Sequence, residues 1–460
     1  MKKGTSFELL ISLPAGRGKR LALESTLRDA IKEKRLRGGE ALPSTRSLAA
    51  DLGVSRRLVV EAYEQLVSEG YLVARERHHT EVAALAAASS LRPPGTEEDP
   101  IPSGDAWRPG APDPTAFPGA RWARLLKEAV GRPETLRYCD PAGLEVLRVE
   151  LSGYLRRVRA VVCDAAQVRV TNGLSGALTL WARCLAAQGV RRVALEHPGP
   201  DGLWDRLRRL DLEVLPLPVD GEGACVHHLE DLDAGAVVLT PAHQFPLGSV
   251  LSPERRARLV AWARQRQGWI FEDDYDAEYR FSGHPIGSLQ GLAPDRVATS
   301  SSVSKTLAPG LRLGWLVLPP SLLDVARARS LDLGQPGPQQ WALAHLLASG
   351  DYDRHVRRQR RVYRQRRRDL GEVLRSHPRL HPRGTRAGLH VWVELKGGGW
   401  QEADRLRQTA RERGIELTTA WPYYWAGPTA TDPAALVLGY AAFPQARWPQ
   451  ALAALDRALS

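Results

Sequence analysis

From about residue 106 onward, short apolar runs alternate with stretches of helix length, and this alternation constrains the fold more than any other feature. The runs are VRVT at 168–171, VAL at 193–195, AVVLT at 236–240, GWIFED at 268–273, VATS at 297–300 and GWLVL at 314–318. They are mostly uninterrupted by polar residues, which is typical of strands buried on both faces. The pattern therefore predicts a mostly parallel sheet covered by helices.

Residues 83–105 separate two parts of different character. Their sequence, AALAAASSLRPPGTEEDPIPSGD, combines small residues, paired prolines and an acidic cluster, and cannot build a core. A chain of 460 residues is also roughly two to three times the length of a usual domain. We therefore predict a multidomain protein, with a small α+β domain at 1–82, a linker at 83–105 and an α/β domain at 106–460.

The chain carries 64 Lys+Arg against 52 Asp+Glu, a formal net charge of +12. This excess permits nucleic acid or anionic ligands as partners without choosing between them. The four cysteines form no CxxC pair, so we expect no disulfides, no metal site and a reducing cytoplasm as the location. No stretch approaches the ~18 apolar residues of a membrane-spanning helix, so we expect no membrane partner.

The segment ALPSTRSLAADLGVSRRLVVEAYEQLVSEGYL has the pattern of two short helices joined by a tight turn. Ser44 and Ser55 are suited to cap the two helices, and Gly53 permits the left-handed turn between them. In a helix-turn-helix the second helix enters the major groove by its N-terminal end, which here carries Arg56 and Arg57. The alternative is a helical hairpin whose basic end is only solvated.

Residues 20–82 resemble the winged-helix domain of GntR-type bacterial transcription regulators almost position by position across that segment. The stretch from Tyr71 to Val82 then fits the two-stranded wing. The resemblance and the helix ends together imply contacts to operator DNA from Ser44, Arg46, Ser55, Arg56, Arg57, His78 and His79. The resemblance thus predicts a double-stranded DNA-binding domain.

The segment SSSVSKTLAPGLRLGWLVLPP at 300–320 carries the sharpest chemical signal. Lys305 follows a serine-rich strand end, and a lysine forms a Schiff base with an aldehyde only when its amine is neutral. Pyridoxal 5'-phosphate also needs donors for its phosphate, and Ser302, Ser304 and Arg312 could supply them. The alternative for Lys305 is an ordinary exposed loop lysine.

Two further segments fit the same cofactor. In GWIFEDDYDAEYRF, Asp273 could hold the ring nitrogen at a strand end and Tyr275 could contact the ring oxygen, unless the run is a solvated acidic loop. In VRVTNGLSGALTLWARCL, a strand and a small-residue turn precede a helix. The backbone amides of Gly173, Leu174 and Ser175 could bind phosphate there, although ordinary α/β turns look the same.

These elements, in this order, resemble the fold-type I aminotransferases over roughly residues 104–460. The likeness includes GAPDPTAFPGARW, YCDPAGLEVLRVELSGYL and TPAHQFPLG. Together with the GntR-like segment, the chain looks like the MocR class of regulators. The resemblance implies a homodimer in which Lys305 is the catalytic Schiff-base lysine and Tyr138 reaches the cofactor of the partner subunit, with His243 also close to the cofactor.

The sequence departs from the aminotransferase pattern where a substrate carboxylate would bind. Val437 stands at the position of the usual arginine, and Pro200 and Gly202 replace a stacking tyrosine and a second arginine. Phe245 replaces the asparagine of the Asn-Pro turn, and Trp204 could supply an aromatic face instead. These changes count against an acid held by two arginines and favour another amine, or the cofactor itself, as the signal.

Residues 354–368, RHVRRQRRVYRQRRR, contain nine arginines. Val356 and Tyr363 could form the buried seam of a solvated basic helix, or the helix could make auxiliary contacts with DNA. We predict a pyridoxal-phosphate-dependent, DNA-binding transcriptional regulator that senses the cofactor or an amino compound. The alternatives are an active aminotransferase with an accessory DNA-binding domain, or a scaffold that only dimerises.

Overall fold

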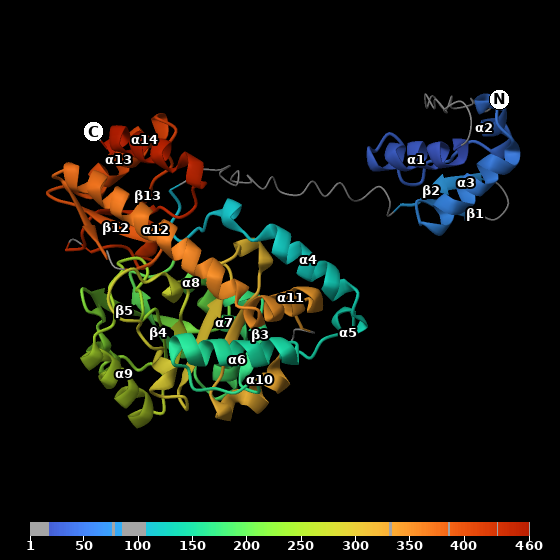
Figure 1. Cartoon of the computed structure of the whole chain (residues 1–460). Helices are drawn as coiled ribbons and strands as arrows, with labels where there is room; N and C mark the ends of the chain where they lie inside the picture. Colours follow the sequence, from blue (N-terminus) through green and yellow to red (C-terminus); the bar gives the residue numbers. More distant parts are fainter. Residues whose placement is uncertain are drawn as a thin grey trace. The chain divides into compact units, whose positions relative to one another are not determined.

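The computed structural model describes residues 18–75, 79–84, 107–330, 334–384, 387–429 and 431–459. The chain forms two compact units, Met1–Ile101 and Pro102–Ser460, and each is described by itself (Figure 1). His78 and the linker residues from 85 onward lie outside the described part. Among the described residues, no helix is both long and apolar enough to span a bilayer.

The described residues of the first unit form three helices and one antiparallel strand pair. They are α1 (Lys19–Lys32), α2 (Thr45–Leu52), α3 (Arg56–Ser68), β1 (Leu72–Arg75) and β2 (His79–Val82). The predicted caps are confirmed, since Ser44 Oγ accepts from the Ser47 amide at 3.1 Å and Ser55 Oγ from the Leu58 amide at 3.3 Å. Gly53 has φ 59°, which gives the predicted left-handed end of α2. The unit is therefore a helix-turn-helix followed by a two-stranded wing.

The second unit is built on an eight-stranded sheet with the order β3-β10-β9-β8-β7-β4-β5-β6. The strands are β3 (Val168–Thr171), β4 (Arg192–His197), β5 (Glu213–Asp220), β6 (Gly223–Ala224), β7 (Ala236–Leu239), β8 (Trp269–Asp273), β9 (Val297–Ser302) and β10 (Gly314–Val317). The five strands from β9 to β5 in this order are parallel, while β10 pairs antiparallel with both β3 and β9. Each predicted apolar run forms a strand, and the mostly parallel sheet is confirmed.

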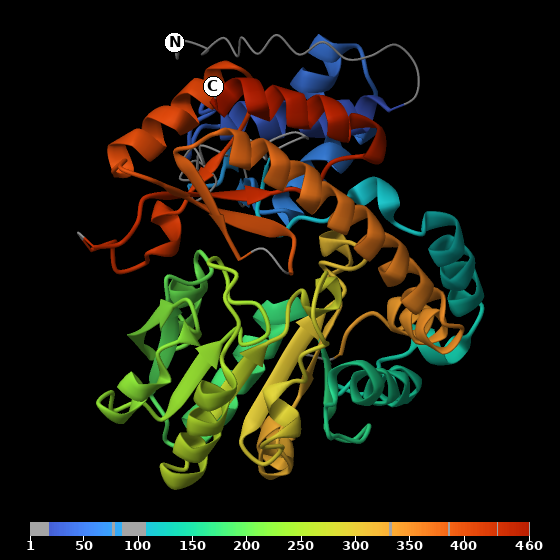
Figure 2. The ribbon, with the colours of Figure 1, turned by 60° about the vertical axis from the view of Figure 1, so that its left-hand side comes forward.

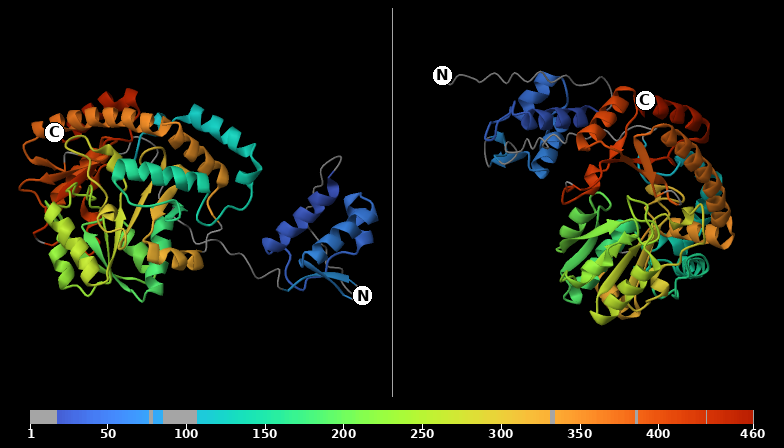
Figure 3. Two further views of the ribbon diagram at one scale, coloured as in Figure 1. Left: turned by 60° about the horizontal axis from the view of Figure 1, so that its bottom comes forward. Right: turned by 90° about the vertical axis from the view of Figure 1, so that its left-hand side faces the viewer.

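Helices cover both faces of this sheet. Alternate residues of a strand face opposite sides, so neighbouring residues pack against different helices. Trp269 and Phe271 of β8 pack in one apolar cluster with α7 (Gly173–Ala187). Ile270 between them packs in another cluster with α9 (Pro253–Gln265). A third cluster joins β3 and β10 to α4 (Gly119–Val130), α6 (Glu145–Arg159) and α11 (Gly337–Ala348). Figure 3 shows the sheet between these helices from two directions.

A second, antiparallel sheet lies near the C-terminus, with the order β11-β12-β14-β13. Its strands are β11 (Leu380–Arg383), β12 (His390–Leu395), β13 (Thr418–Thr419) and β14 (Ala435–Gly439), and α13 (Trp400–Glu412) and α14 (Trp448–Leu459) pack beside it. The helix α12 (Asp351–Ser376) contacts β11, α14 and α11, and so links this sheet to the rest of the unit (Figure 2).

The helix α12 contains the arginine-rich segment. Val356 and Tyr363 are buried, as the predicted seam requires. The expectation of an entirely solvated basic face is wrong for Arg366 and Arg367, which are also buried. Arg366 donates to the Ala441 carbonyl at 2.9 Å and lies 3.4 Å from the Asp113 carboxylate. Partners of this kind offset part of the cost of burying the Arg366 guanidinium. Because Arg366 and Arg367 are both buried, this end of α12 is part of the core.

Candidate functional site

Lys305 and Asp273 lie at the carboxyl ends of the parallel strands β9 and β8. Asp273 is the last residue of β8, pairs in register with Ser300 and is only 6% exposed. Lys305 follows β9 in a tight turn. A Cβ atom on Gly110 would lie 3.2 Å from Lys305 Nζ, so the chain around residue 110 closes over the lysine. Gly110 also has φ 71°, a conformation that other residues rarely adopt.

Burial changes the ionisation of both groups. It raises the pKa of Asp273 to about 8, with a further contribution from neighbouring Asp274. Burial also lowers the pKa of Lys305, against the opposing attraction of Asp276 and Asp273. The lysine is therefore displaced toward the neutral amine that a Schiff base requires. Among the residues that the structure describes, the Asp273 carboxyl has no ion pair, and a protonated ring nitrogen would supply one.

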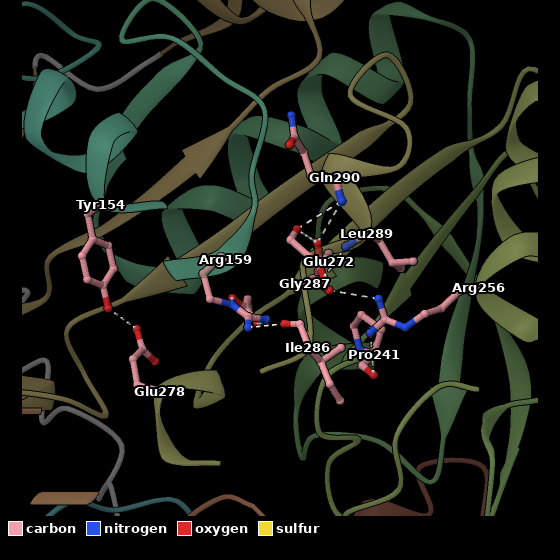
Figure 4. A network of polar contacts seen from close by, with 12 residues as sticks. Tyr154, Arg159, Pro241, Arg256, Glu272, Glu278, Ile286, Gly287, Leu289 and Gln290 are labelled. Carbon is pink, nitrogen blue, oxygen red and sulfur yellow. Dashed lines mark hydrogen bonds and ion pairs between the residues drawn. The ribbon is translucent and has the colours of Figure 1, made fainter. Parts of the chain in front are cut away.

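The acidic run that begins at the last residue of β8 is not a solvated loop, because Asp273, Asp274 and Asp276 are all buried. Arg159 donates to the two carboxylate oxygens of Asp274 at 2.6 and 2.8 Å. Figure 4 shows Arg159 beside a network that continues to Glu272 at the end of β8. A bidentate pair of this kind fixes the chain directly after Asp273.

Tyr275 and His243 form a second polar group at the same strand ends. The Tyr275 hydroxyl lies 2.9 Å from His243 Nδ1, and that nitrogen lies 3.0 Å from the Asp276 carboxylate. Burial and the nearby Asp276 raise the pKa of Tyr275 well above its usual value, so the phenol stays protonated. The ring of His390 lies 5.1 Å from that of His243.

The side chains of His243, Asp276 and His390 are close enough to be considered as metal ligands. Each ring uses one nitrogen in a hydrogen bond: His243 Nδ1 faces Tyr275 and Asp276, and His390 Nε2 lies 3.0 Å from the Pro246 carbonyl. These bonds orient both imidazoles beside Tyr275.

The first turn of α7 and Arg312 form a concave group of donors. Gly173, Leu174 and Ser175 open the helix, and its N-cap Asn172 makes no side-chain capping bond to their amides. Arg312 donates to the Asn172 carbonyl at 3.0 Å, and a Cβ on Gly173 would lie 3.3 Å from the guanidinium.

Ser302 lies beside this group, because a Cβ on Gly314 would approach both it and Gly173. The Ser304 amide donates to Ser302 Oγ at 3.3 Å. Ser175 Oγ accepts from Arg206 Nη1 at 2.9 Å, so a second arginine comes near. Backbone amides at a helix start, hydroxyls and a guanidinium together suit a phosphate dianion.

The residues that we expect to contact DNA lie at the N-terminal ends of α2 and α3 and in the wing. Arg46 and Arg56 are exposed, and Arg57 has 88% of its side chain exposed beside Glu61 at 2.8 Å. Ser44 and Ser55 accept capping bonds but keep their hydroxyl protons, which can still be donated to a phosphate. In the wing, the half-exposed His79 lies 3.7 Å from Glu81. These residues lie at the starts of two helices and in the wing, an arrangement compatible with groove binding.

Comparisons with known proteins match two separate parts of the chain. The family described as bacterial regulatory proteins, gntR family, matches residues 19–82, and aminotransferase class I and II matches residues 112–448. The pyridoxine biosynthesis regulator PdxR of Corynebacterium glutamicum is 33% identical over 95% of both chains. The probable rhizopine catabolism regulator MocR of Rhizobium meliloti is 35% identical over 77% of both. This chain belongs to the MocR class of transcriptional regulators.

Solved structures show the fold of the larger unit of this MocR-class regulator. The α-aminoadipate aminotransferase LysN from Thermus thermophilus matches with a TM-score of 0.68 and 25% identity, over 77% of this chain and 91% of LysN. The fold-type I aminotransferase architecture is therefore confirmed. It is the fold of a pyridoxal-phosphate-binding family.

Two of the predicted departures of this MocR-class chain, Val437 and Phe245, pack in the same apolar cluster. Val437 in β14 is fully buried in an apolar cluster with Trp392, Tyr423 and Tyr424. Phe245 packs edge-on against Tyr275, with ring centroids 6.0 Å apart. This side of the site is thus aromatic and apolar, and carries no guanidinium at residue 437.

The structure also shows the surroundings of two other predicted residues, Trp204 and Tyr138. Trp204 stacks on Trp425 at 6.1 Å, and so contributes to a neighbouring aromatic group. Tyr138 is 92% exposed in the turn before α6. Its predicted role depends on a second subunit.

Sequence reasoning missed Gly110, Asp276 and His390. Asp276 belongs to the acidic run that drew attention to Asp273, so its proximity could have been considered. Gly110 and His390 are far from Lys305 in sequence. They come near it only because the segment around residue 110 and the strand β12 fold against the Lys305 turn. No local pattern marks either residue.

Proposed function

We propose that this regulator binds pyridoxal 5'-phosphate at Lys305, and that the cofactor or an amino compound bound there controls binding of the 1–82 domain to operator DNA. The observation that carries the proposal is the buried Lys305–Asp273 pair, whose pKa values are displaced in opposite directions. Perturbed groups of this kind in one cleft are typical of functional sites. The cytoplasm is the expected location.

Each group of the site has a distinct task in this proposal. Bound pyridoxal phosphate supplies an aldehyde and an electron-accepting ring. Lys305 provides the nucleophilic amine, while Asp273 holds a proton at the ring nitrogen. Tyr275, oriented by His243, donates toward the ring oxygen. Arg312 and the start of α7 hold the phosphate, together with Ser302 and Ser304.

The cofactor itself is our preferred signal. Val437 places a buried apolar side chain where the aminotransferases carry a carboxylate-binding arginine, and Phe245 adds an aromatic wall. An acid bound there would lose charge-assisted hydrogen bonds worth about 1.5–3 kcal/mol each. PdxR, by its name, regulates pyridoxine biosynthesis, so genes of vitamin B6 metabolism are the expected targets.

A homodimer is part of the proposal. Val146 and Val149 on one stripe of α6 are exposed, as is Tyr138, and such apolar groups favour contact with another chain. Two winged helices in the dimer would bind two half-sites. Residues 83–105 would act as the linker that sets their reach, and residues 106–460 as the sensing domain.

The decisive experiment is footprinting on DNA upstream of the regulator's own gene, with and without pyridoxal phosphate. Wild type should change its footprint when the cofactor is added, while Lys305→Ala should bind the same DNA without that response. An identical footprint with and without cofactor in the wild type would show that the cofactor is not the signal.

An active aminotransferase is the second candidate, since Lys305, Asp273 and Tyr275 lie together as catalysis requires. A half-reaction assay with a panel of amino acids separates the candidates. Rapid conversion of the bound cofactor to its amine form by several amino acids would favour the enzyme. Slow or absent conversion, with a cofactor-dependent footprint, supports the regulator.

A further inference from the structure

A cavity of about 540 Å³ lies on the second unit between α6, α12 and the segment 277–285. Six arginines line it: Arg157, Arg159, Arg280, Arg357, Arg360 and Arg364. None of the residues assigned to the cofactor lines this cavity. Its size is within the range of small-molecule sites, and it is a separate feature of the fold.

Carboxylates in the wall balance only part of this charge. Asp353 lies 2.8 Å from Arg157, and Arg159 is paired with Asp274 behind the wall. Glu278 is buried and accepts from the Tyr154 hydroxyl at 3.2 Å (Figure 4). Burial raises the pKa of Glu278 to about 7, so it is partly uncharged near neutral pH. The cavity therefore keeps an excess of positive charge.

Arg357 and Arg364 account for the excess on α12. They are two helical turns apart on one face of the helix, and both are exposed. Within the described residues, neither has a hydrogen bond or an ion pair, whereas Arg360 between them donates to the Glu278 carbonyl at 2.6 Å. Guanidinium groups held around one cavity repel one another, and an anion bound there would offset this repulsion.

The wall also has an apolar part. Val158, Phe281 and Val356 line the cavity beside the arginines. We propose that this cavity binds a small organic polyanion, namely a di- or triphosphate of mononucleotide size with an apolar or aromatic portion. The guanidiniums would hold the phosphates bidentately, and the apolar wall would hold the rest.

The geometry favours a small ligand over duplex DNA. The charged groups come from three segments around a recess, and Arg159 and Glu278 lie buried at its wall, beyond the reach of a rigid duplex. The wall residues Ala277 and Glu278 directly follow Tyr275 and Asp276 in the chain. An occupied cavity could therefore affect the Tyr275 segment through that short connection.

Isothermal titration of the full-length protein, loaded with pyridoxal phosphate so that the cofactor's own phosphate site is filled, tests the proposal. The probes are inorganic tripolyphosphate and adenosine 5'-triphosphate, each without metal. The double variant Arg357→Gln/Arg364→Gln should bind both probes about tenfold or more weakly than wild type. The matched control is Arg361→Gln/Arg368→Gln, two exposed arginines with the same spacing on α12 that do not line the cavity; it should bind normally.

Three results would overturn the proposal. The first is that the wild type binds neither probe. The second is an equal loss in both double variants, which would mean general attraction to a basic helix. The third is unchanged probe binding in Arg357→Gln/Arg364→Gln together with weaker operator binding, which would assign these arginines to DNA. A retained cofactor absorbance spectrum in each variant shows that the site at Lys305 is intact.

Discussion

Replacing Asp273 by asparagine should stabilise the cofactor-free protein, and the gain should grow with pH. The carboxyl has a folded pKa of about 8 against an ordinary value of 3.8. Between these values the unfolded chain releases a proton that the folded chain retains, so ionisation favours unfolding more as pH rises. Asparagine keeps the shape of the side chain but removes this pH-dependent penalty.

The size of the effect follows from the two pKa values. Each pH unit between them costs about 1.36 kcal/mol, which gives an upper bound of about 4 kcal/mol at pH 7. The penalty is absent below pH 3.8, increases through neutral pH and is complete above pH 8. Relaxation of the site and entry of water will reduce the measured value, so about 2 kcal/mol at pH 7 is a realistic expectation.

Urea unfolding of the cofactor-free wild type and Asp273→Asn, at several pH values from 5.5 to about 8, measures this difference. The control is Asp295→Asn, which removes the carboxylate of an aspartate whose side chain is 57% exposed and leaves the buried site unchanged. With pyridoxal phosphate added, the wild type should gain more stability than the variant, since only an aspartate can pair with a protonated ring nitrogen. A pH-independent difference, or an Asp273→Asn protein less stable at every pH, would refute the argument.

Three further substitutions have distinct expected results. Lys305→Ala should abolish the borohydride-trapped mass increase of the lysine peptide after incubation with pyridoxal phosphate, as mass spectrometry would show; trapping at another lysine would contradict the assignment. Arg57→Ala should weaken operator binding by about 1–3 kcal/mol in fluorescence anisotropy, and unchanged affinity would remove it from the contact surface. Arg159→Met should leave the buried Asp274 carboxylate unpaired and cost about 3–5 kcal/mol of stability in urea unfolding; near-normal stability would mean that water replaces the guanidinium.

Much of the fold could be predicted because its central strands are buried on both faces. Runs such as AVVL in β7 contain no polar residues, so they cannot be mistaken for the mixed polar and apolar pattern of a surface helix. The strand β5 was not predicted, since Pro216 and Pro218 interrupt EVLPLPVD and a proline usually argues against a strand inside a sheet. The C-terminal sheet was also missed, because its strands are short and pair across loops and helices that no local pattern specifies.

The candidate site shows the same division between local and long-range information. Asp273 and Lys305 lie at strand ends, and the carboxyl ends of neighbouring parallel strands must meet at one edge. Their closeness therefore follows from the predicted sheet. His390 and Gly110 come from β12 and from the first segment of the unit, whose positions depend on how the C-terminal sheet packs. Burial itself, which sets the ionisation of Asp273, also could not be predicted from residue type.

The opposite displacements of the two pKa values have one cause, and this explains why they point to a cofactor. Burial disfavours every charge, so it moves Asp273 toward the neutral acid and Lys305 toward the neutral amine. A mere structural ion pair would instead favour the charged forms, as nearby, where Asp274 raises the pKa of the buried Arg159. Both shifts point the same way, toward the neutral form: the lysine is moved toward a nucleophilic amine and the aspartate toward a neutral acid, and a ligand with an aldehyde and a basic ring nitrogen suits both groups.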